Sequence, residues 1–190
     1  MSTMRTSTTL PLPSGTSARL RWPVAVLSGA VLVALAGQVA VPVPFSPVPM
    51  TLQGPAVILV GGLFGGTAAL GSILLYLAAG AFGAPVFANG GAGLARLFGP
   101  TGGYLLAFLP AVLVVARVAE RGRFLRCLLA AFAGMAVMHL GGWAQLALLT
   151  GNGQAAFAAG VVPFLVLDPI KALLAAAVLW RGHHALRPFA

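Results

Sequence analysis

The sequence predicts an all-α integral membrane protein of six transmembrane helices, with the N- and C-termini in the cytoplasm. Two observations on composition predict this class: 59% of the 190 residues are hydrophobic, and only 7% are charged. A soluble domain carries about 25% charged residues, so a chain this poor in charge cannot cover a soluble globule with polar surface. The third observation is the distribution of charge, because the whole stretch from Trp22 to Ala95 carries none. Lipid must therefore be the solvent for most of the chain.

Six apolar segments are candidates to cross the membrane, which takes about 20 apolar residues for a helix. The second and third come from one apolar run that is interrupted only by glycines at 61, 62, 65 and 66. We therefore expect two short helices joined by a glycine turn. The six predicted helices span residues 22–41, 54–65, 67–83, 103–119, 124–149 and 161–181.

The first 21 residues are rich in Ser, Thr and Pro and contain no acidic residue. They are predicted to form a disordered basic arm (residues 1–21), and residues 22–190 are predicted to form one transmembrane substrate-binding domain. The alternative is a cleaved signal peptide. The apolar run continues to Val41, long enough to span, and Gln38 occupies the −3 position of the best cleavage site, so an uncleaved first helix is favoured.

The arginines predict the orientation, because short cytoplasmic loops carry an excess of Lys and Arg. Nine of the ten arginines fall in segments 1–21, 117–126 and 181–190, and only Arg96 falls on the opposite side. A five-helix alternative would separate the C-terminal arginines from the N-terminal ones. The net charge of +9 is thus a topology signal for a multi-pass protein of the cytoplasmic membrane, and no nucleic-acid partner is expected.

Two charged residues lie inside the last predicted helix. Lys171 is ten residues before Arg181, which places it about 15 Å from the inner boundary of the membrane. Asp168 is three residues away on the same helix face, so the two charges can neutralise each other. Asp168 followed by Pro169 is also the signature of a helix start. An ion pair that only holds helices together is one interpretation; a ligand site is favoured, because ionisable residues within membranes are usually functional.

The predicted outer loops contain the other candidate binding residues. The glycine-rich segment 83–104 carries Asn89 and Arg96. The guanidinium of Arg96, on the predicted outer side of the membrane, either binds an anionic group of a ligand or is a solvated anchor. The proline-rich segment 42–53 is predicted to act as a lid, and Gln53 either belongs to this gate or caps the second helix. Tyr76, Phe87 and Tyr104 either stack on a flat ligand or fill the core, and spacing alone favours the core.

Small residues four apart let helices approach closely in lipid. Ala30 and Ala34 have this spacing in the first predicted helix. They either pack inside the bundle or form a face for another membrane protein, and composition favours internal packing.

Four motifs together resemble the BioY family, the biotin-binding S components of energy-coupling factor (ECF) transporters. They are PVPMTLQ at 47–53, YLAAGAFGAPVF at 76–87, GPTGGY at 99–104 and DPIK at 168–171. The resemblance implies a six-helix bundle that binds biotin near its outer face, under the loop after the first helix. It implies a transmembrane T component and two cytoplasmic ATPase subunits as partners, with Ala30 and Ala34 on the docking face. It implies no cofactor, since biotin is the transported ligand.

Transferred position by position, the resemblance places Asp168 and Lys171 at the ureido ring of biotin. The ureido N–H groups need an acceptor such as a carboxylate, and the ureido oxygen needs a donor from Asn89 or Lys171. Arg96 would bind the valerate carboxylate, and Tyr76 and Phe87 would flank the bicycle, with Gln53 in the lid motif. The chain departs from the family at Gly54, where a threonine is common.

Two other functions are compatible with a membrane protein of this composition. An intramembrane enzyme would need paired acids, a metal cluster or an activated nucleophile. Glu120 lies in a cytoplasmic arginine cluster, and His139 is interpreted as packing against Trp143, so neither an enzyme nor a metal site is expected. The second rival is an S component for another small vitamin, or a solitary carrier that works without ATPase partners. The chain has no phosphate-binding loop of its own, so ATP would act only through partners.

Overall fold

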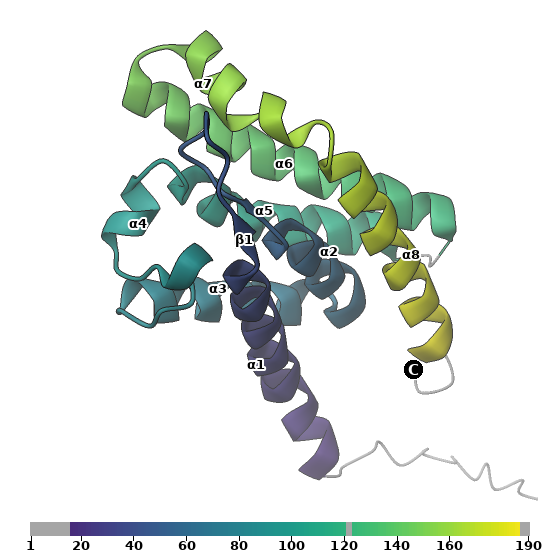
Figure 1. Cartoon of the computed structure of the whole chain (residues 1–190). Coiled ribbons are helices and arrows are strands. Elements are labelled where there is room, and N and C mark those ends of the chain that lie inside the picture. Colours follow the sequence, from purple (N-terminus) through teal and green to yellow (C-terminus); the bar gives the residue numbers. More distant parts are fainter. Residues whose placement is uncertain (1–15, 121–122, 187–190) are drawn as a thin grey trace, which may run out of the picture.

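The computed structural model describes residues 16–120 and 123–186, which are almost entirely helical (Figure 1). Two short antiparallel strands, β1 (Ala40–Val41) and β2 (Met50–Thr51), close the proline-rich loop that follows the first helix. The helices in chain order are α1 (Thr16–Gln38), α2 (Gln53–Phe64), α3 (Gly66–Ala81), α4 (Ala95–Phe98), α5 (Gly102–Ala119), α6 (Phe124–Thr150), α7 (Gly153–Gly160) and α8 (Asp168–Leu186), with 3-10 turns η1 (Ala88–Gly90) and η2 (Val162–Phe164).

Helix α2 lies at the centre of the bundle and packs against α1, α3, α5, α6 and α8. Val57, Ile58 and Val60 are fully buried, as expected for a helix that is apolar on every face. A Cβ added at Gly61 would lie 2.9 Å from the backbone oxygen of Val112 in α5. Gly61 therefore lets α2 approach α5 closely. Gly65 follows the last residue of α2, where the helix ends.

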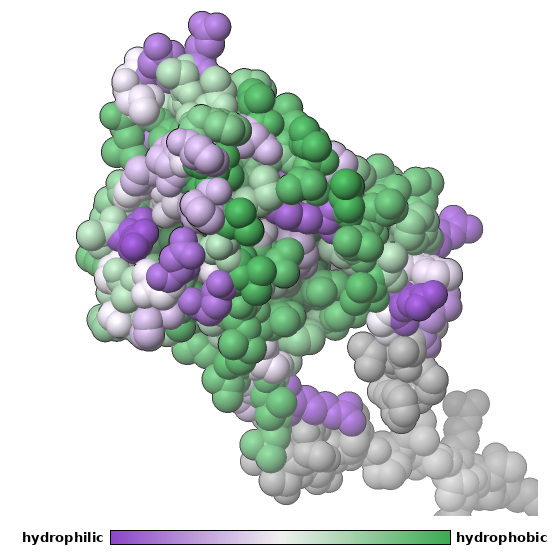
Figure 2. All heavy atoms as spheres, viewed as in Figure 1, coloured by the Kyte–Doolittle hydropathy of each residue, from purple (hydrophilic) through white to green (hydrophobic). Residues whose placement is uncertain are grey.

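Helix lengths divide the apolar segments into two groups. Within the described residues, α1, α5 and α6 are long and apolar enough to cross a membrane, and the bent pair α7–η2 plus α8 makes a fourth candidate. Helices α2 and α3 have 12 and 16 residues, so they are about 18 and 24 Å long, less than the ~30 Å hydrocarbon core. Large apolar side chains are exposed along α1, α6 and α8 (Figure 2). The fold is thus a helical membrane bundle with three or four segments of spanning length.

Several predicted boundaries need correction. Helix α1 begins at Thr16, inside the segment predicted as a disordered arm, and residues 1–15 lie outside the described structure. The helix predicted over 161–181 is not continuous, because η2 ends at Phe164 and α8 begins at Asp168, with a bend of 51° between the two parts. The helix restart at the Asp-Pro pair is confirmed to within one residue. The glycine turn between α2 and α3 is also confirmed, since Gly65 has a φ of 77°.

Ala30 and Ala34, the predicted docking residues, take part in packing within the chain. Ala30 is 7% exposed and belongs to the hydrophobic core, and Ala34 is partly buried against the same core. Helix α1 packs closely on α3 here, because a Cβ at Gly29 would collide with Ser72. The exposed face of α1 carries larger side chains, namely Leu27, Val31 and Leu35. The small residues of α1 serve internal packing.

Replacing Ala30 with leucine should therefore destabilise the fold by about 1–3 kcal/mol, because a larger side chain must displace the core residues packed around position 30. The measurement is unfolding of the purified protein in detergent. Val31→Leu, one residue along the helix and exposed, is the matched control and should leave stability unchanged. Equal stabilities of the two variants would contradict the burial of Ala30.

Candidate ligand-binding site

A cavity of about 330 Å³ opens between the loop after α1, the turn at 87–89, and helices α5, α6 and α8. This volume is within the range of small-molecule sites. Its apolar wall is formed by Phe87, Leu105, Phe108, Met135, Met138 and Phe164 together with Pro42, Val43, Pro47, Val48 and Pro49 of the proline-rich loop. The polar residues that line it are Ser46, Thr51, Gln53, Asn89, Arg96, Thr101, Tyr104, His139, Asp168 and Lys171.

Asp168 is the centre of a polar cluster on the cavity wall. Its Oδ1 accepts a hydrogen bond from Lys171 Nζ at 3.0 Å, and its Oδ2 lies 2.7 Å from His139 Nε2. Lys171 Nζ also donates to the backbone oxygen of Thr51 at 3.2 Å. The cluster thus joins α6, α8 and β2. The three side chains are 15–18% exposed, so the Asp168 and Lys171 charges compensate each other in a largely desolvated place.

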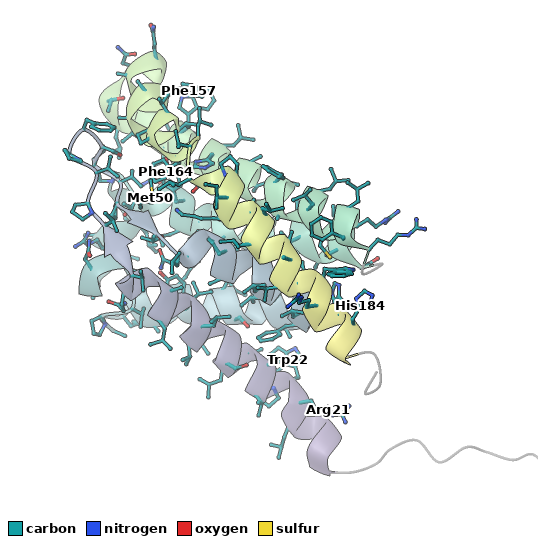
Figure 3. All side chains as sticks on the ribbon, turned by 45° about the vertical axis from the view of Figure 1, so that its right-hand side comes forward. Arg21, Trp22, Met50, Phe157, Phe164 and His184 are labelled. Carbon is teal, nitrogen blue, oxygen red and sulfur yellow. The ribbon has the colours of Figure 1, made fainter. Side chains whose placement is uncertain are left out.

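The start of α8 lies at the end of the molecule that holds the cavity. Met50 of β2 and Phe164 of η2 lie at this end, and Arg21 and His184 lie at the other (Figure 3). The first turn of α1 and the last turn of α8 lie on the same side of the bundle (Figure 1), at the end opposite Met50 and Phe164 (Figure 3).

Asn89 lies in the turn η1 and lines the cavity. Its φ of 57° is left-handed, which Asn tolerates better than most residues. Gln38, at the end of α1, holds this turn on both sides of Asn89. Its Nε2 donates to Phe87 O at 3.3 Å, and its Oε1 accepts from Gly90 N at 3.0 Å. Sequence reasoning misses this role of Gln38, because nothing in the sequence pairs positions 38 and 89.

Arg96 lies on the short helix α4 and is exposed at the edge of the same cavity. Gln145 of α6 fixes the segment that carries it, donating to Leu97 O at 3.0 Å and to Gly99 O at 2.6 Å. A Cβ at Gly91 would lie 3.1 Å from Arg96 Cζ, so the guanidinium lies close to this glycine. The lack of a side chain at position 91 leaves space for it.

Tyr76 and Gln53 differ in their relation to the cavity. Gln53 is the first residue of α2, is buried and lines the cavity. Tyr76 is 1% exposed and does not line the cavity, so its ring lies behind the cavity wall. The Tyr76 hydroxyl accepts a hydrogen bond from Gln53 Nε2 at 2.5 Å, and its ring meets Phe87 edge-on at 5.5 Å. Tyr76 therefore supports two cavity residues from behind.

His139 is the main residue that sequence reasoning misjudges. The sequence suggests packing against Trp143, but His139 Nε2 is hydrogen-bonded to Asp168, and Trp143 instead donates to Gly153 O at 2.9 Å. The available signal is its polarity within an apolar helix, the same signal that identifies Asp168. Tyr104 also lines the cavity, and its hydroxyl donates to the backbone oxygen of Gly160. Of the seven predicted ligand contacts, six share one cavity and Tyr76 does not.

These observations define a class: a mostly helical membrane protein with a small-molecule cavity that combines a compensated ion pair with an apolar wall. In the described part of the chain, no three His, Cys, Asp or Glu side chains are grouped to hold a metal ion. The chain belongs to the BioY family, whose sequence model matches residues 6–188.

Named relatives agree with this membership. The chain is 41% identical over 139 residues to a probable biotin transporter BioY of Pyrococcus horikoshii, covering 73% of this chain and 83% of that one. It is 35% identical over 140 residues to the biotin transporter BioY of Thermotoga maritima, with coverage of 73% and 83%. Both relatives are named as transporters and not as enzymes.

A solved structure shows the same fold. The crystal structure of the S-component for biotin from an ECF-type ABC transporter superposes with a TM-score of 0.80, at 22% sequence identity. The match covers 88% of this chain and 93% of that chain. The order and packing of the helices are therefore those of an S component.

Proposed function

We propose that the protein captures biotin with high affinity for uptake across the cytoplasmic membrane, as the S component of an ECF-type transporter. The observation that carries the proposal is the cavity, which combines the Asp168–Lys171 pair with an apolar wall in a chain of the BioY family. Biotin has matching parts: a polar ureido group, an apolar bicycle and a carboxylate on a flexible chain. The names of the relatives support the same ligand.

The proposed contacts follow from donor and acceptor chemistry. Asp168 accepts a ureido N–H, and Lys171 or Asn89 donates to the ureido oxygen. Arg96 binds the valerate carboxylate, since a guanidinium matches a carboxylate in a bidentate manner. Phe87 contacts the bicycle, and Gln53 contributes to the same wall. Tyr76 acts indirectly, by holding Phe87 and Gln53.

We propose six membrane crossings with both termini in the cytoplasm, so that α2 and α3 also count as crossings although they are short. Short helices are accommodated where the bilayer thins locally or where neighbouring helices surround them, and α2 is surrounded by five helices. The nine arginines of the predicted inner segments support this orientation. The first turn of α1 and the last turn of α8 lie on the same side of the bundle, which also supports placing both termini on one side of the membrane (Figure 1). The protein would then be a multi-pass protein of the cytoplasmic membrane.

The proposed partners are a transmembrane T component and two cytoplasmic ATPase subunits. The proposal is supported by the structural neighbour, which is the S-component of an ECF-type ABC transporter, and by the lack of a phosphate-binding loop in this sequence. Docking through Ala30 and Ala34 would involve a part of α1 where Ala30 already packs in the core and Ala34 is partly buried.

Calorimetry with purified protein tests the ligand and the carboxylate contact together. Biotin should bind the wild type at least about tenfold more tightly than biotin methyl ester, which lacks the charge that Arg96 recognises; a charged hydrogen bond is worth about 1.5–3 kcal/mol. Arg96→Ala should bind the two compounds equally, and Arg126→Ala, on the cytoplasmic side, should keep the wild-type preference. Binding of another vitamin in place of biotin would overturn the proposal. Equal wild-type affinities would remove only the role of Arg96.

A further inference from the structure

His139 lies at a boundary between two spaces. It lines the ligand cavity and also an apolar groove of about 440 Å³ between α6, α7 and α8, and Met135 and Asp168 line both as well. Its ring is fixed by aromatic neighbours, with Tyr104 edge-on at 6.1 Å and Phe164, labelled in Figure 3, at 5.6 Å. A side chain packed on both sides in this way has little rotational freedom. The position of its Nε2 is therefore set by the surrounding helices.

The contacts of Asp168 are not equivalent. Lys171 belongs to α8, three residues from Asp168, so it moves with Asp168 when α8 shifts. His139 belongs to α6, and its 2.7 Å contact to Oδ2 is the side-chain hydrogen bond that joins the carboxylate to a different helix within the described structure. With Lys171 on Oδ1 and His139 on Oδ2, the carboxylate cannot rotate without losing one of these bonds. His139 therefore fixes the place of Asp168 relative to the opposite wall of the cavity.

The hydrogen bonds also indicate which imidazole nitrogen carries the proton. A carboxylate oxygen only accepts, so Nε2 must donate. Nδ1 is buried, and no described residue forms a hydrogen bond with it. A proton on Nδ1 would be a buried donor without an acceptor, which is more costly than an unshared lone pair in the same place. The arrangement therefore places a proton on Nε2, from which it is donated to Asp168.

We propose that His139 is a positioning residue for ligand binding, and that its Nε2–H holds the Asp168 carboxylate where it receives the ureido N–H of biotin. This inference rests on the proposed function. His139 acts through Asp168 without touching the ligand's ureido group itself. A ligand contact to a carboxylate that is free to rotate is weaker, because binding must first order the acceptor.

Three substitutions separate the hydrogen bond from simple packing. His139→Gln keeps an N–H at the place of Nε2, since both nitrogens are four bonds from Cα. His139→Asn puts its amide at the place of Nδ1, out of reach of Asp168. His139→Leu keeps the bulk that separates the cavity from the groove but has no donor. We expect biotin affinity to fall about tenfold in His139→Asn and His139→Leu, and less than threefold in His139→Gln.

The test uses the full chain in detergent, with calorimetry for affinity and thermal unfolding to confirm that each variant is folded. Equal affinity of all variants and the wild type would overturn the positioning role, as would an equal loss in His139→Gln and His139→Leu. A wild type that does not bind biotin would instead overturn the proposed function. ¹⁵N spectra of histidine-labelled protein then still report on the contact. The His139 resonances, identified by their absence from the spectrum of His139→Gln, should show a protonated Nε2, and an unprotonated Nε2 would exclude the donation to Asp168.

Discussion

Asp168→Asn should weaken biotin binding by about a hundredfold, or about 2.7 kcal/mol. Both carboxylate oxygens already accept hydrogen bonds, one from Lys171 and one from His139. The amide of asparagine has only one oxygen, so its NH₂ group must face one of these donors. Lys171 also loses its counter-charge in a largely buried place. The ligand thus loses a charged hydrogen-bond acceptor, and the side chains of His139 and Lys171 lose the carboxylate that orders them.

Calorimetry on the purified variant measures this loss, and the chain offers a matched control. Glu120 is the other acidic residue of the sequence, and it follows the last residue of α5, on the side proposed to be cytoplasmic. Glu120→Gln removes the same charge and should bind biotin like the wild type. Unchanged affinity in Asp168→Asn would exclude Asp168 as a ligand contact.

Gly103→Ala should lower the stability of the fold by about 3 kcal/mol or more. A Cβ at this position would overlap the backbone oxygen of Gly141 in α6 and would lie 2.7 Å from Gln145 Cβ. Backbone atoms cannot move aside by changing rotamer, so α5 and α6 would have to separate. Tyr104 follows Gly103 directly and lines the cavity with His139, so the separation should also reduce biotin affinity.

Unfolding in detergent measures the stability of this variant against Gly66→Ala. A Cβ at Gly66 would meet its nearest neighbours at 3.9 and 4.0 Å, which is ordinary contact, so this control should be as stable as the wild type. If Gly103→Ala were as stable as Gly66→Ala, the close approach of α5 and α6 at this point would be wrong.

The local relations were predictable from the sequence. Asp168 and Lys171 are three residues apart on one helix, and this spacing alone brings their side chains together. The restart of the helix at the Asp-Pro pair and the turn at Gly65 follow from the backbone preferences of proline and glycine, which are local to those residues. The sorting of arginines likewise needs only their order along the chain. Family motifs predicted the ligand contacts that residue spacing alone did not predict.

The contacts between distant segments were not predictable. His139 and Asp168 are 29 residues apart on different helices. Gln38 and Gly90, whose hydrogen bond holds the turn that contains Asn89, are 52 residues apart. Neither pair has a spacing rule, because helix packing decides which positions meet. For the same reason the bend between η2 and α8, and the helix α7 in a segment expected to be a loop, appear only in the structure.

The sequence by itself determined that this is a helical membrane protein of the BioY type with an ion pair inside its last helix. Only the tertiary structure decided which face of each helix is inside. It buried Ala30 and Tyr76, left Leu27 and Leu35 exposed, and brought His139 to Asp168. The physical reason is that lipid and protein core are both apolar, so a membrane helix lacks the polar face that reveals orientation in a soluble protein.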